Sequence, residues 1–330
     1  MSPKKAILVG ISGCSSSGKT TLARLIRDIF PNTFILHEDD FYKPESELPK
    51  RAGHADWDCV ESLNIGHMEK SLTYIRENGK FPPDLNSIED QNAVGKCPVS
   101  DAKIQELKAK VEEWSKPDGP GHGLLVPGDL GLCILDGFLL YTPPLKHIMS
   151  LLDLKFFLLV SRDTAIRRRE ARIGYVTVEG FWADPEGYAT DVVWPNYAES
   201  HAWLFKDGDV EGELDADAVR ENRILVQADR GTDVDMEITL EWVVGELMRE
   251  LPRVAARPGL VPIPDLLPDV LLGHIYPAIG KTLVFRAPET TEHIRPYPLE
   301  YTGSRPLSPS QTSEGRTSTQ VGDHWGILGV

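Results

Sequence analysis

Residues 13–20 are Gly13-Cys14-Ser15-Ser16-Ser17-Gly18-Lys19-Thr20, and this stretch decides the fold. It fits the pattern G-x-x-x-x-G-K-[ST] at every defined position. Its glycines let the backbone turn tightly, so that successive N–H groups point at one anion, and the helix that follows adds its positive N-terminal end. In such a loop the lysine reaches the β- and γ-phosphates, and the threonine hydroxyl ligates Mg²⁺. We therefore expect residues 13–21, ending at Thr21, to bind ATP.

The segments around this loop alternate between short apolar runs and stretches with helical spacing. Ala6–Ile11 predicts a strand before the loop. Thr20–Phe30 predicts a helix after it, because its apolar residues fall on one stripe. Further strands are predicted at 33–36, 132–135, 155–160 and 223–227, and further helices at 61–75, 101–114, 163–172, 191–205 and 234–251. Strands that alternate with helices indicate an α/β fold with a parallel sheet.

Composition excludes several classes of partner. The 330-residue chain carries 35 basic and 50 acidic residues, a net charge of −15. It therefore lacks the positive footprint of a general nucleic-acid binder, and we expect no nucleic-acid partner. No apolar stretch approaches about 20 residues, so we expect no membrane partner. The four cysteines form no C-x-x-C pair and no secretory leader is visible, which favours a cytoplasmic location, with the nucleus as the alternative.

The character of the sequence changes after residue 252. Residues 253–330 hold 10 of the 25 prolines, and their seven basic and seven acidic residues cancel, so the whole −15 belongs to residues 1–252. Ser, Thr, Gly and Pro dominate residues 302–322. We interpret 1–252 as one α/β domain with an insert at about 80–130, and 253–330 as a mostly disordered extension.

Acidic residues follow two of the predicted strands. Asp39 and Asp40 come after the second strand, and Asp136 ends an apolar run that has the form of a Walker-B segment. Ligands of open parallel sheets bind beyond the carboxyl ends of the strands. A kinase needs one carboxylate near Mg²⁺ and one that accepts the proton of the attacking hydroxyl. Both sites are candidates for these roles, although Asp after a strand can also serve only as a cap or turn former.

Four arginines lie close together in this acidic chain, at 167, 168, 169 and 172. On a helix, Arg167, Arg168 and Arg172 can flank one another, while Arg169 points elsewhere. Such a set can clamp a transferring phosphoryl group from a mobile lid, or it can be a solvated helix C-terminus. Beside a phosphate loop the lid is favoured, and the Gly- and aromatic-rich stretch 173–188 suits a moving flap.

Two classes of nucleotide-binding protein are disfavoured. The sequence has no N-K-x-D segment of the kind that reads guanine, which argues against a GTPase. It also lacks the second strand-rich half of a helicase or transporter ATPase. A small-molecule kinase remains.

Together these residues resemble the fungal nicotinamide riboside kinases, within the uridine-kinase-like group of nucleoside kinases. The resemblance covers about residues 5–251, and its D-D-F-Y-K and W-D segments are more specific than the phosphate loop. The matching segments are Ile7–Thr21, His37–Lys43, Asp56–Asp58, Asp136–Phe138, Arg167–Arg169, Gly180–Pro185, Asn196-Tyr197 and Leu204–Gly212.

The resemblance implies a P-loop kinase fold with a five-stranded parallel sheet, helices on both faces and a lid at about 167–190. It implies transfer of the γ-phosphate of ATP to the ribose 5′-hydroxyl of nicotinamide riboside, and of nicotinic acid riboside as a second substrate. The implied cofactors are ATP and Mg²⁺, and the implied partner is a small nucleoside.

The resemblance also implies roles for single residues. Asp39 matches the catalytic base, with Lys19 and Arg168 acting on the phosphate, and Arg168 and Arg172 match nucleotide contacts. Trp57 is expected to stack on the pyridine ring and Asp58 to bind the ribose hydroxyls. The expected substrate-binding residues are Asp39, Asp40, Phe41, Tyr42, Trp57, Asp58, Arg169 and Tyr175, and the expected Mg²⁺ ligands are Thr20, Asp39 and Asp136.

Two alternatives stay open. One is a uridine, cytidine or pantothenate kinase on the same fold, which the Trp57-Asp58 pair disfavours. The other is a non-catalytic nucleotide-binding regulator, which the presence of Lys19, Asp39 and Arg168 disfavours.

Overall fold

The structure is a computed structural model, and it describes residues 4–257 apart from 86, 88–94, 173 and 178–179. All of these belong to the compact unit Met1–Pro268. The predicted disordered extension lies outside the described residues from 258 onward, as does part of the predicted insert.

Five parallel strands form the central sheet, in the order β2-β5-β1-β6-β9. Their bounds are Ala6–Gly13 for β1, Thr33–His37 for β2, Gly131–Asp136 for β5, Leu154–Leu158 for β6 and Ile224–Leu225 for β9. Every neighbouring pair is parallel, so all five carboxyl ends meet at one edge of the sheet. The predicted five-stranded parallel sheet is confirmed.

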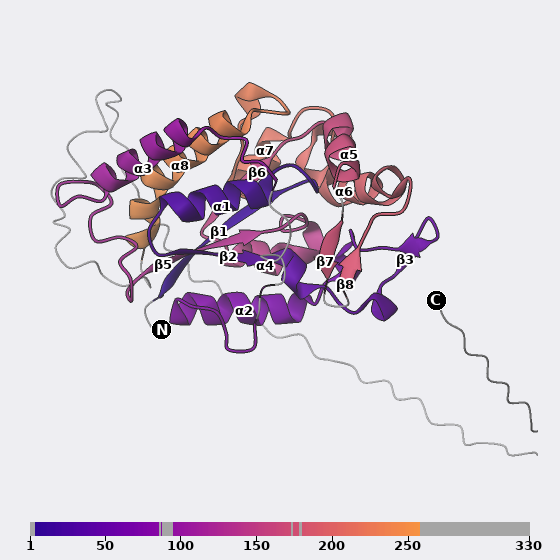
Figure 1. The fold of residues 1–330 in the computed structure, drawn as a ribbon, viewed down its shortest axis with the longest axis horizontal. Helices are drawn as coiled ribbons and strands as arrows, with labels where there is room; N and C mark the ends of the chain where they lie inside the picture. The colour runs from indigo at the N-terminus through magenta and orange to yellow at the C-terminus, as the bar shows by residue number, and fades with distance from the viewer. Residues whose placement is uncertain (1–3, 86, 88–94, 173, 178–179, 258–330) are drawn as a thin grey trace, which may run out of the picture. The chain divides into compact units, whose positions relative to one another are not determined.

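One face of the sheet is covered by three helices: α1 (Lys19–Ile29), α3 (Asp101–Trp114) and α8 (Met236–Ala255). Figure 1 shows them side by side on that face. Successive side chains of a strand point to opposite faces. Accordingly, Ile7 and Val9 of β1 lie in the core beneath these helices.

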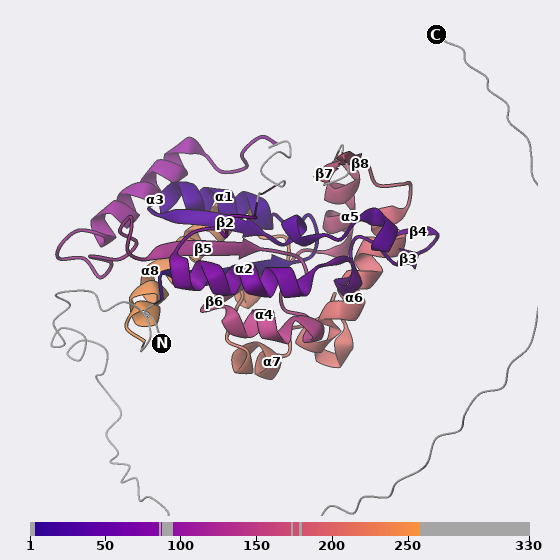
Figure 2. The same cartoon turned by 90° about the horizontal axis from the view of Figure 1, so that it is seen from below.

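The other residues of β1, such as Ala6 and Leu8, lie in a second core on the opposite face. It is covered by α2 (Ile65–Asn78), α4 (Lys146–Leu151) and α6 (Trp194–His201), with the short α7 (Ala216–Glu221) nearby. Figure 2 shows α2 and α4 across the sheet from α1 and α3. The α/β architecture with helices on both faces is therefore confirmed.

Two small hairpins and one helix complete the end of the molecule that carries the site. The helix α5 spans Arg162–Glu170. One antiparallel hairpin pairs β3 (Lys50–Arg51) with β4 (His54–Ala55), and the other pairs β7 (Tyr175–Thr177) with β8 (Gly180–Trp182). Figure 1 shows both hairpins at the same end as α5 and α6.

Several boundaries differ from the predicted ones. The helix predicted at 61–75 begins only at Ile65, because Asn64 caps it and a 3₁₀ turn at Val60–Ser62 precedes it. The segment predicted as one helix at 191–205 is broken into a π-helical turn at Ala189–Val193, then α6, then a 3₁₀ turn at Ala202–Leu204.

The last helix runs past its predicted end. It continues to Ala255 although Pro252 lies inside it, because Val254 and Ala255 are buried against the core. The change of composition after residue 252 therefore falls within the last turn of α8. Within the described residues, no helix combines the length and the apolar character that crossing a membrane requires.

Candidate active site

The phosphate loop joins the end of β1 to the start of α1. Gly13 and Gly18 have φ angles of 145° and 100°, which side chains rarely allow. A Cβ atom on Gly13 would lie 2.5 Å from the carbonyl oxygen of Leu158, so the loop needs glycine there. The buried hydroxyls of Ser16 and Ser17 have no hydrogen-bond partner within the described structure. The loop thus offers buried donors of the kind that bind a phosphate.

Lys19 is buried at the start of α1, where its Nζ donates to the carbonyl oxygen of Cys14 at 2.9 Å. A buried ammonium group is costly unless anions compensate it. The next residue, Thr20, donates a hydrogen bond to Asp136 at the end of β5. The phosphate loop and the Walker-B aspartate therefore meet directly, as the sequence predicts.

Asp136 is buried and stays anionic. Burial alone would raise its pKa, but the hydrogen bond and charge of His37 together with Lys19 and Thr20 outweigh burial and hold the pKa below its usual value. The Nδ1 atom of His37 lies 3.3 Å from Oδ2 of Asp136. Because His37 ends β2, which pairs with β5, the sheet itself sets this contact.

Asp39 lies in the 3₁₀ turn Glu38–Phe41 that follows β2. Burial and the negative charge of Asp136 raise its pKa to about 6, while the charges of Lys19, His37 and Arg172 act in the opposite direction. The structure thus brings the predicted Asp39, Asp136, Lys19 and Arg172 into one electrostatic unit.

These residues could bind Mg²⁺ only if a nucleotide completes the coordination of the ion. The described residues contain no group of three or more His, Cys, Asp or Glu side chains that could hold a metal ion. Mg²⁺ in nucleotide enzymes is usually held by one or two carboxylates, with substrate phosphates and waters filling the other positions. The contact between Thr20 and Asp136, and the repulsion between Asp136 and Asp39, match such a partial site.

The arginines of α5 diverge from one another. Arg167 donates to the hydroxyl of Thr164 at 3.1 Å. Arg168 lines a small pocket of about 40 Å³ beside the phosphate loop, with Ser17, Gln227 and Met236. Arg169 turns the other way and is only 7% exposed. The expectation that Arg169 points away from its neighbours is confirmed.

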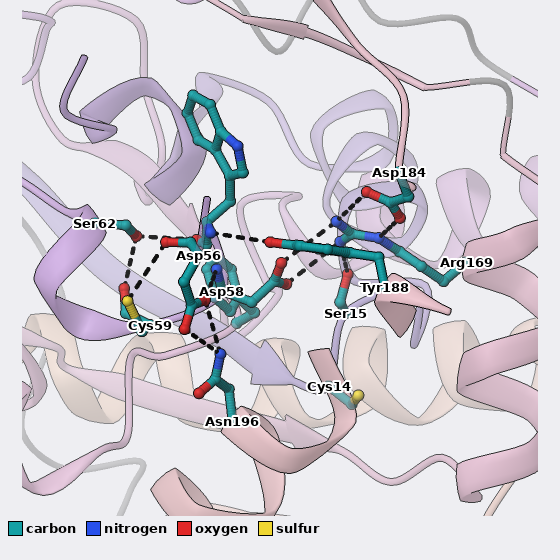
Figure 3. Close-up of polar contacts among 12 residues, drawn as sticks. Cys14, Ser15, Asp56, Asp58, Cys59, Ser62, Arg169, Asp184, Tyr188 and Asn196 are labelled. Atoms are coloured by element: carbon teal, nitrogen blue, oxygen red, sulfur yellow. Dashed lines mark hydrogen bonds and ion pairs between the residues drawn. The ribbon is translucent and has the colours of Figure 1, made fainter. Parts of the chain in front are cut away.

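Arg169 lies at the centre of a polar network (Figure 3). Its Nε and Nη2 donate to the two carboxylate oxygens of Asp184 at 2.6 and 3.1 Å. Its Nη1 donates to the hydroxyl of Ser15, in the phosphate loop, at 2.7 Å. Both Nη atoms lie 3.4 Å from the carboxylate oxygens of Asp58. One guanidinium therefore spans the phosphate loop and the W-D segment.

Tyr188 fixes the backbone of the W-D segment. Its hydroxyl accepts a hydrogen bond from the backbone N–H of Trp57 at 3.0 Å and donates one to the carbonyl oxygen of Ala55 at 3.2 Å. The indole ring of Trp57 meets the ring of Tyr42 edge-on, with 5.2 Å between centroids. It also packs on Trp182, with 5.6 Å between centroids. An aromatic cluster thus lies next to the carboxylate of Asp58.

Sequence comparison places this site among known proteins. Nicotinamide riboside kinase of Schizosaccharomyces pombe is 36% identical over 248 residues, which cover 75% of this chain and 99% of the relative. The enzyme of the same name from Saccharomyces cerevisiae is 34% identical over 254 residues, covering 76% and 98%. Nicotinamide riboside kinase 1 of Homo sapiens is 26% identical over 194 residues, covering 58% and 75%.

This chain belongs to the nicotinamide riboside kinase family. No family model matches it. Among solved structures, thymidylate kinase from Candida albicans aligns over 76% of the chain, but its TM-score of 0.33 and identity of 13% add nothing to the assignment.

Three predicted substrate residues of this kinase need comment. Phe41 is 1% exposed and packs in the core against His67, with 5.2 Å between ring centroids. A ring so enclosed could contact a ligand only after a rearrangement, and the predicted role of Phe41 in substrate binding stays a prediction. Tyr175 lies on β7 with its Cα opposite that of Trp182, and its side chain is outside the described part of the structure. Asp40 is half-buried in the same turn as Asp39.

Sequence reasoning missed Glu38, although it lies within the quoted H-E-D-D-F segment. Its Oε2 accepts from the backbone N–H groups of Phe138 at 2.6 Å and Leu139 at 3.0 Å. Burial raises the pKa of Glu38 to about 8. A Cβ on Gly137 would lie 2.6 Å from this carboxylate. The absence of a side chain at Gly137 therefore leaves room for Glu38 to accept these two hydrogen bonds.

Sequence reasoning also missed the polar partners of Arg169 and the segment that lines the pocket near Arg168. Asp184 falls in the matching segment Gly180–Pro185 and Tyr188 in the Gly- and aromatic-rich stretch, but the sequence assigns neither a role. Gln227 and Met236 lie in a segment with no motif. Only the fold brings these residues to the phosphate loop, so no local pattern could have found them.

Proposed function

We propose that this kinase transfers the γ-phosphate of ATP to the ribose 5′-hydroxyl of nicotinamide riboside, giving nicotinamide mononucleotide for NAD salvage in the cytoplasm. Nicotinic acid riboside is the proposed second substrate. The observation that carries the proposal is the position of Arg169, which joins the phosphate loop to the Trp57-Asp58 segment. A phosphate donor bound to the phosphate loop and an acceptor bound to the Trp57-Asp58 segment would both lie next to the Arg169 side chain.

The donor half rests on the phosphate loop. The N–H groups of residues 13–21 would cradle the triphosphate, and Lys19 would place its charge on the transferring group. Thr20, Asp136 and Asp39 would hold Mg²⁺, which neutralises charge on the β- and γ-phosphates. The pocket beside Ser17, lined by Arg168 and Gln227, is next to the phosphate loop, and at about 40 Å³ it would have to open to take the base of the nucleotide.

Asp39 is the proposed base for the 5′-hydroxyl. Burial and Asp136 raise its pKa to about 6 in the absence of Mg²⁺, so the carboxylate is largely ionised at neutral pH and can accept a proton. Mg²⁺ bound at the same site would lower this pKa. The positive charge of Arg172 lowers the pKa of Asp39, so the two groups lie near each other. Arg172 could therefore stabilise the negative charge on the phosphoryl group during transfer.

The acceptor half rests on the aromatic cluster. A pyridinium ring is cationic, and the faces of indole and phenol rings attract cations. Trp57 and Tyr42 supply such faces, and Asp58 supplies a carboxylate for the ribose hydroxyls. Because Trp57 is 6% exposed and packed on Trp182, a bound pyridine ring requires the two indole rings to separate.

The deciding experiment measures ADP release from Mg-ATP with nicotinamide riboside, nicotinic acid riboside, uridine, cytidine, pantothenate or no acceptor. The proposal predicts turnover that depends on the two pyridine ribosides, and its loss in Asp39→Asn, which serves as the catalytically dead control. Turnover with uridine, cytidine or pantothenate alone would overturn the acceptor assignment while keeping the phosphate chemistry. Absence of acceptor-dependent turnover would favour a nucleotide-binding regulator.

A further inference from the structure

We propose that Asp184 is a positioning residue that holds Arg169 across the phosphate loop and the acceptor segment, and so couples the binding of the two substrates. The inference rests on the proposed function, because it takes Asp58 as the residue that binds the ribose of the acceptor.

The contacts of Arg169 account for all its N–H donors. A guanidinium carries five of them in a fixed fork. Nε uses its one donor on Asp184, Nη2 divides its two between Asp184 and Asp58, and Nη1 divides its two between Asp58 and Ser15. These three partners constrain the orientation of the guanidinium.

These partners are not equal in strength. The contacts to Asp184 are 2.6 and 3.1 Å and the contact to Ser15 is 2.7 Å, and all three are close hydrogen bonds to a charged donor. The two contacts to Asp58 are 3.4 Å each, at the outer limit. Asp184 and Ser15 thus anchor Arg169, and Asp58 is its weakest partner.

Asp184 is itself fixed in place. The indole Nε1 of Trp182 donates to its Oδ1 at 3.0 Å, and its side chain is 16% exposed. The ring of Tyr188 lies under the guanidinium, with 5.9 Å from the ring centroid to Cζ of Arg169. Asp184 and the ring of Tyr188 therefore orient the guanidinium, as Figure 3 shows, and the indole of Trp182 orients Asp184.

This arrangement leaves Asp58 available to the acceptor. Asp184 neutralises the charge of Arg169. The ribose hydroxyls can therefore donate hydrogen bonds to the carboxylate of Asp58 while Arg169 keeps its ion pair with Asp184. Without the carboxylate of Asp184, the positive charge of Arg169 is less neutralised, and Asp58 is drawn into a tighter ion pair with it. The ribose would then compete with Arg169 for Asp58, and acceptor affinity would fall.

The bond to Ser15 extends the effect to the nucleotide. When the acceptor fixes Asp58 and Arg169, it also fixes a hydroxyl of the phosphate loop. Coupling of this kind is reciprocal: the acceptor must raise the affinity for nucleotide by the same factor by which the nucleotide raises the affinity for acceptor. We expect wild-type protein to show such a factor above one.

The test compares Asp184→Asn with Glu186→Gln, a matched control that removes an exposed carboxylate two residues away. Steady-state kinetics give KM for nicotinamide riboside, KM for ATP and kcat. Calorimetry gives the Kd of a non-hydrolysable ATP analogue with and without the riboside. Asp184→Asn is expected to raise the KM for the riboside by about tenfold or more, the loss typical of a hydrogen bond to a charged group. Its coupling factor is expected to fall to one, while Glu186→Gln matches wild type.

Two further variants separate positioning from stability. Ser15→Ala removes the hydrogen bond between Arg169 and the phosphate loop, so the coupling factor should fall to one. Because Asp184 still holds Arg169 through two contacts, the affinity for riboside in the absence of nucleotide should fall less than in Asp184→Asn. Trp182→Phe removes the donor to Asp184 and keeps an aromatic ring, so it gives a smaller rise in the riboside KM, and it decides the matter if Asp184→Asn does not fold. Asp184→Glu, which keeps the charge, should recover part of the riboside affinity.

The two proposals fail in different ways. If the wild type phosphorylates a different nucleoside, the proposed function fails and the same titrations are run with that nucleoside. If the wild type phosphorylates nicotinamide riboside but Asp184→Asn and Trp182→Phe behave like Glu186→Gln, the role of Asp184 is overturned. A wild-type coupling factor of one would overturn the coupling.

Discussion

At the scale of single residues, Lys19 carries the clearest test of the phosphate chemistry. Its ammonium group is buried and bonded to the loop carbonyl of Cys14, next to the carboxylates of Asp39 and Asp136. Lys19→Ala should lower kcat/KM by about 3 kcal/mol of transition-state stabilisation, because it removes a preorganised charge aimed at the transferring phosphate. Steady-state kinetics check this, with thermal unfolding to confirm that the variant is folded. Unchanged kcat/KM would remove Lys19 from the mechanism.

His201 gives a pH-dependent prediction for stability. It is fully buried between the rings of Tyr197 and Phe157, and burial lowers its pKa from 6.5 to about 4, although the carbonyl of Tyr197 acts in the opposite direction. Between pH 6.5 and 4, His201 is protonated in the unfolded chain and neutral in the folded chain. The free energy of unfolding therefore falls as pH falls through this window, by about 2 kcal/mol at pH 5 from this residue alone.

His201→Phe keeps a ring in the same packing and removes the titration. Urea unfolding at pH 7 and pH 5 should show a drop in stability that is smaller than in the wild type by about that amount. The control is His147→Asn, which changes an exposed histidine and should keep the wild-type drop. An equal drop in all three proteins would mean that His201 does not titrate in this way.

At the scale of elements, the sequence predicts best where local pattern and tertiary role agree. The helix α3 falls at its predicted residues, Asp101–Trp114, because Ser100 caps it and its buried residues Leu107, Val111 and Trp114 recur at helical spacing. The strand–loop–helix unit of β1 and α1 follows from the phosphate-loop motif. By contrast, β9 has only two residues and is defined by pairing with β6, which no local propensity reveals.

The site follows the same rule. Lys19, Thr20, Asp39 and Asp136 could be predicted because a motif or a strand end marks each of them. The burial of Phe41 could not be predicted, because adjacent residues in a turn point in different directions, and sequence does not show which of Phe41 and Tyr42 enters the core. Asp184 could not be assigned a role because its partners, Trp182 and Arg169, meet only through the folded 162–188 segment.

Trp114 tests the role of α3 within the predicted insert. It meets Phe30 of α1 edge-on, with 6.1 Å between centroids, and its Nε1 donates to the carbonyl of Met248 in α8 at 3.0 Å. Trp114→Ala should lower the free energy of unfolding by about 3–5 kcal/mol, because it leaves a large cavity and an unpaired carbonyl. Chemical denaturation measures the loss, and Glu112→Ala, exposed on the same helix, should change little.

The buried residues of α3 lie in the same core as those of α1 and α8. We therefore expect α3 to contribute to the stability of the fold rather than to substrate binding. Below its lowered melting temperature, Trp114→Ala should therefore keep the wild-type KM for both substrates. A folded variant with a changed riboside KM would show that the insert takes part in the acceptor site.

At the scale of the whole molecule, the two cores and the site are all built from residues before 258. The helix α8 closes one core with Leu247, Leu251 and Val254, and its first turn places Met236 beside the phosphate loop. Every described site residue, from Gly13 to Met236, therefore lies before the end of α8. The sequence change at 252 misses this end by one turn of helix.

A chain that ends at residue 257 should therefore keep the wild-type kcat, KM values and melting temperature, because it retains every residue of α8. A chain that ends at residue 250 should lose stability, since it removes the buried Leu251 and Val254, and each such side chain contributes about 1.5–3 kcal/mol through burial. Thermal unfolding and ADP release from both truncations separate these effects. If the 257-residue chain folds with the wild-type melting temperature and yet fails to turn over, residues 258–330 supply part of the active site.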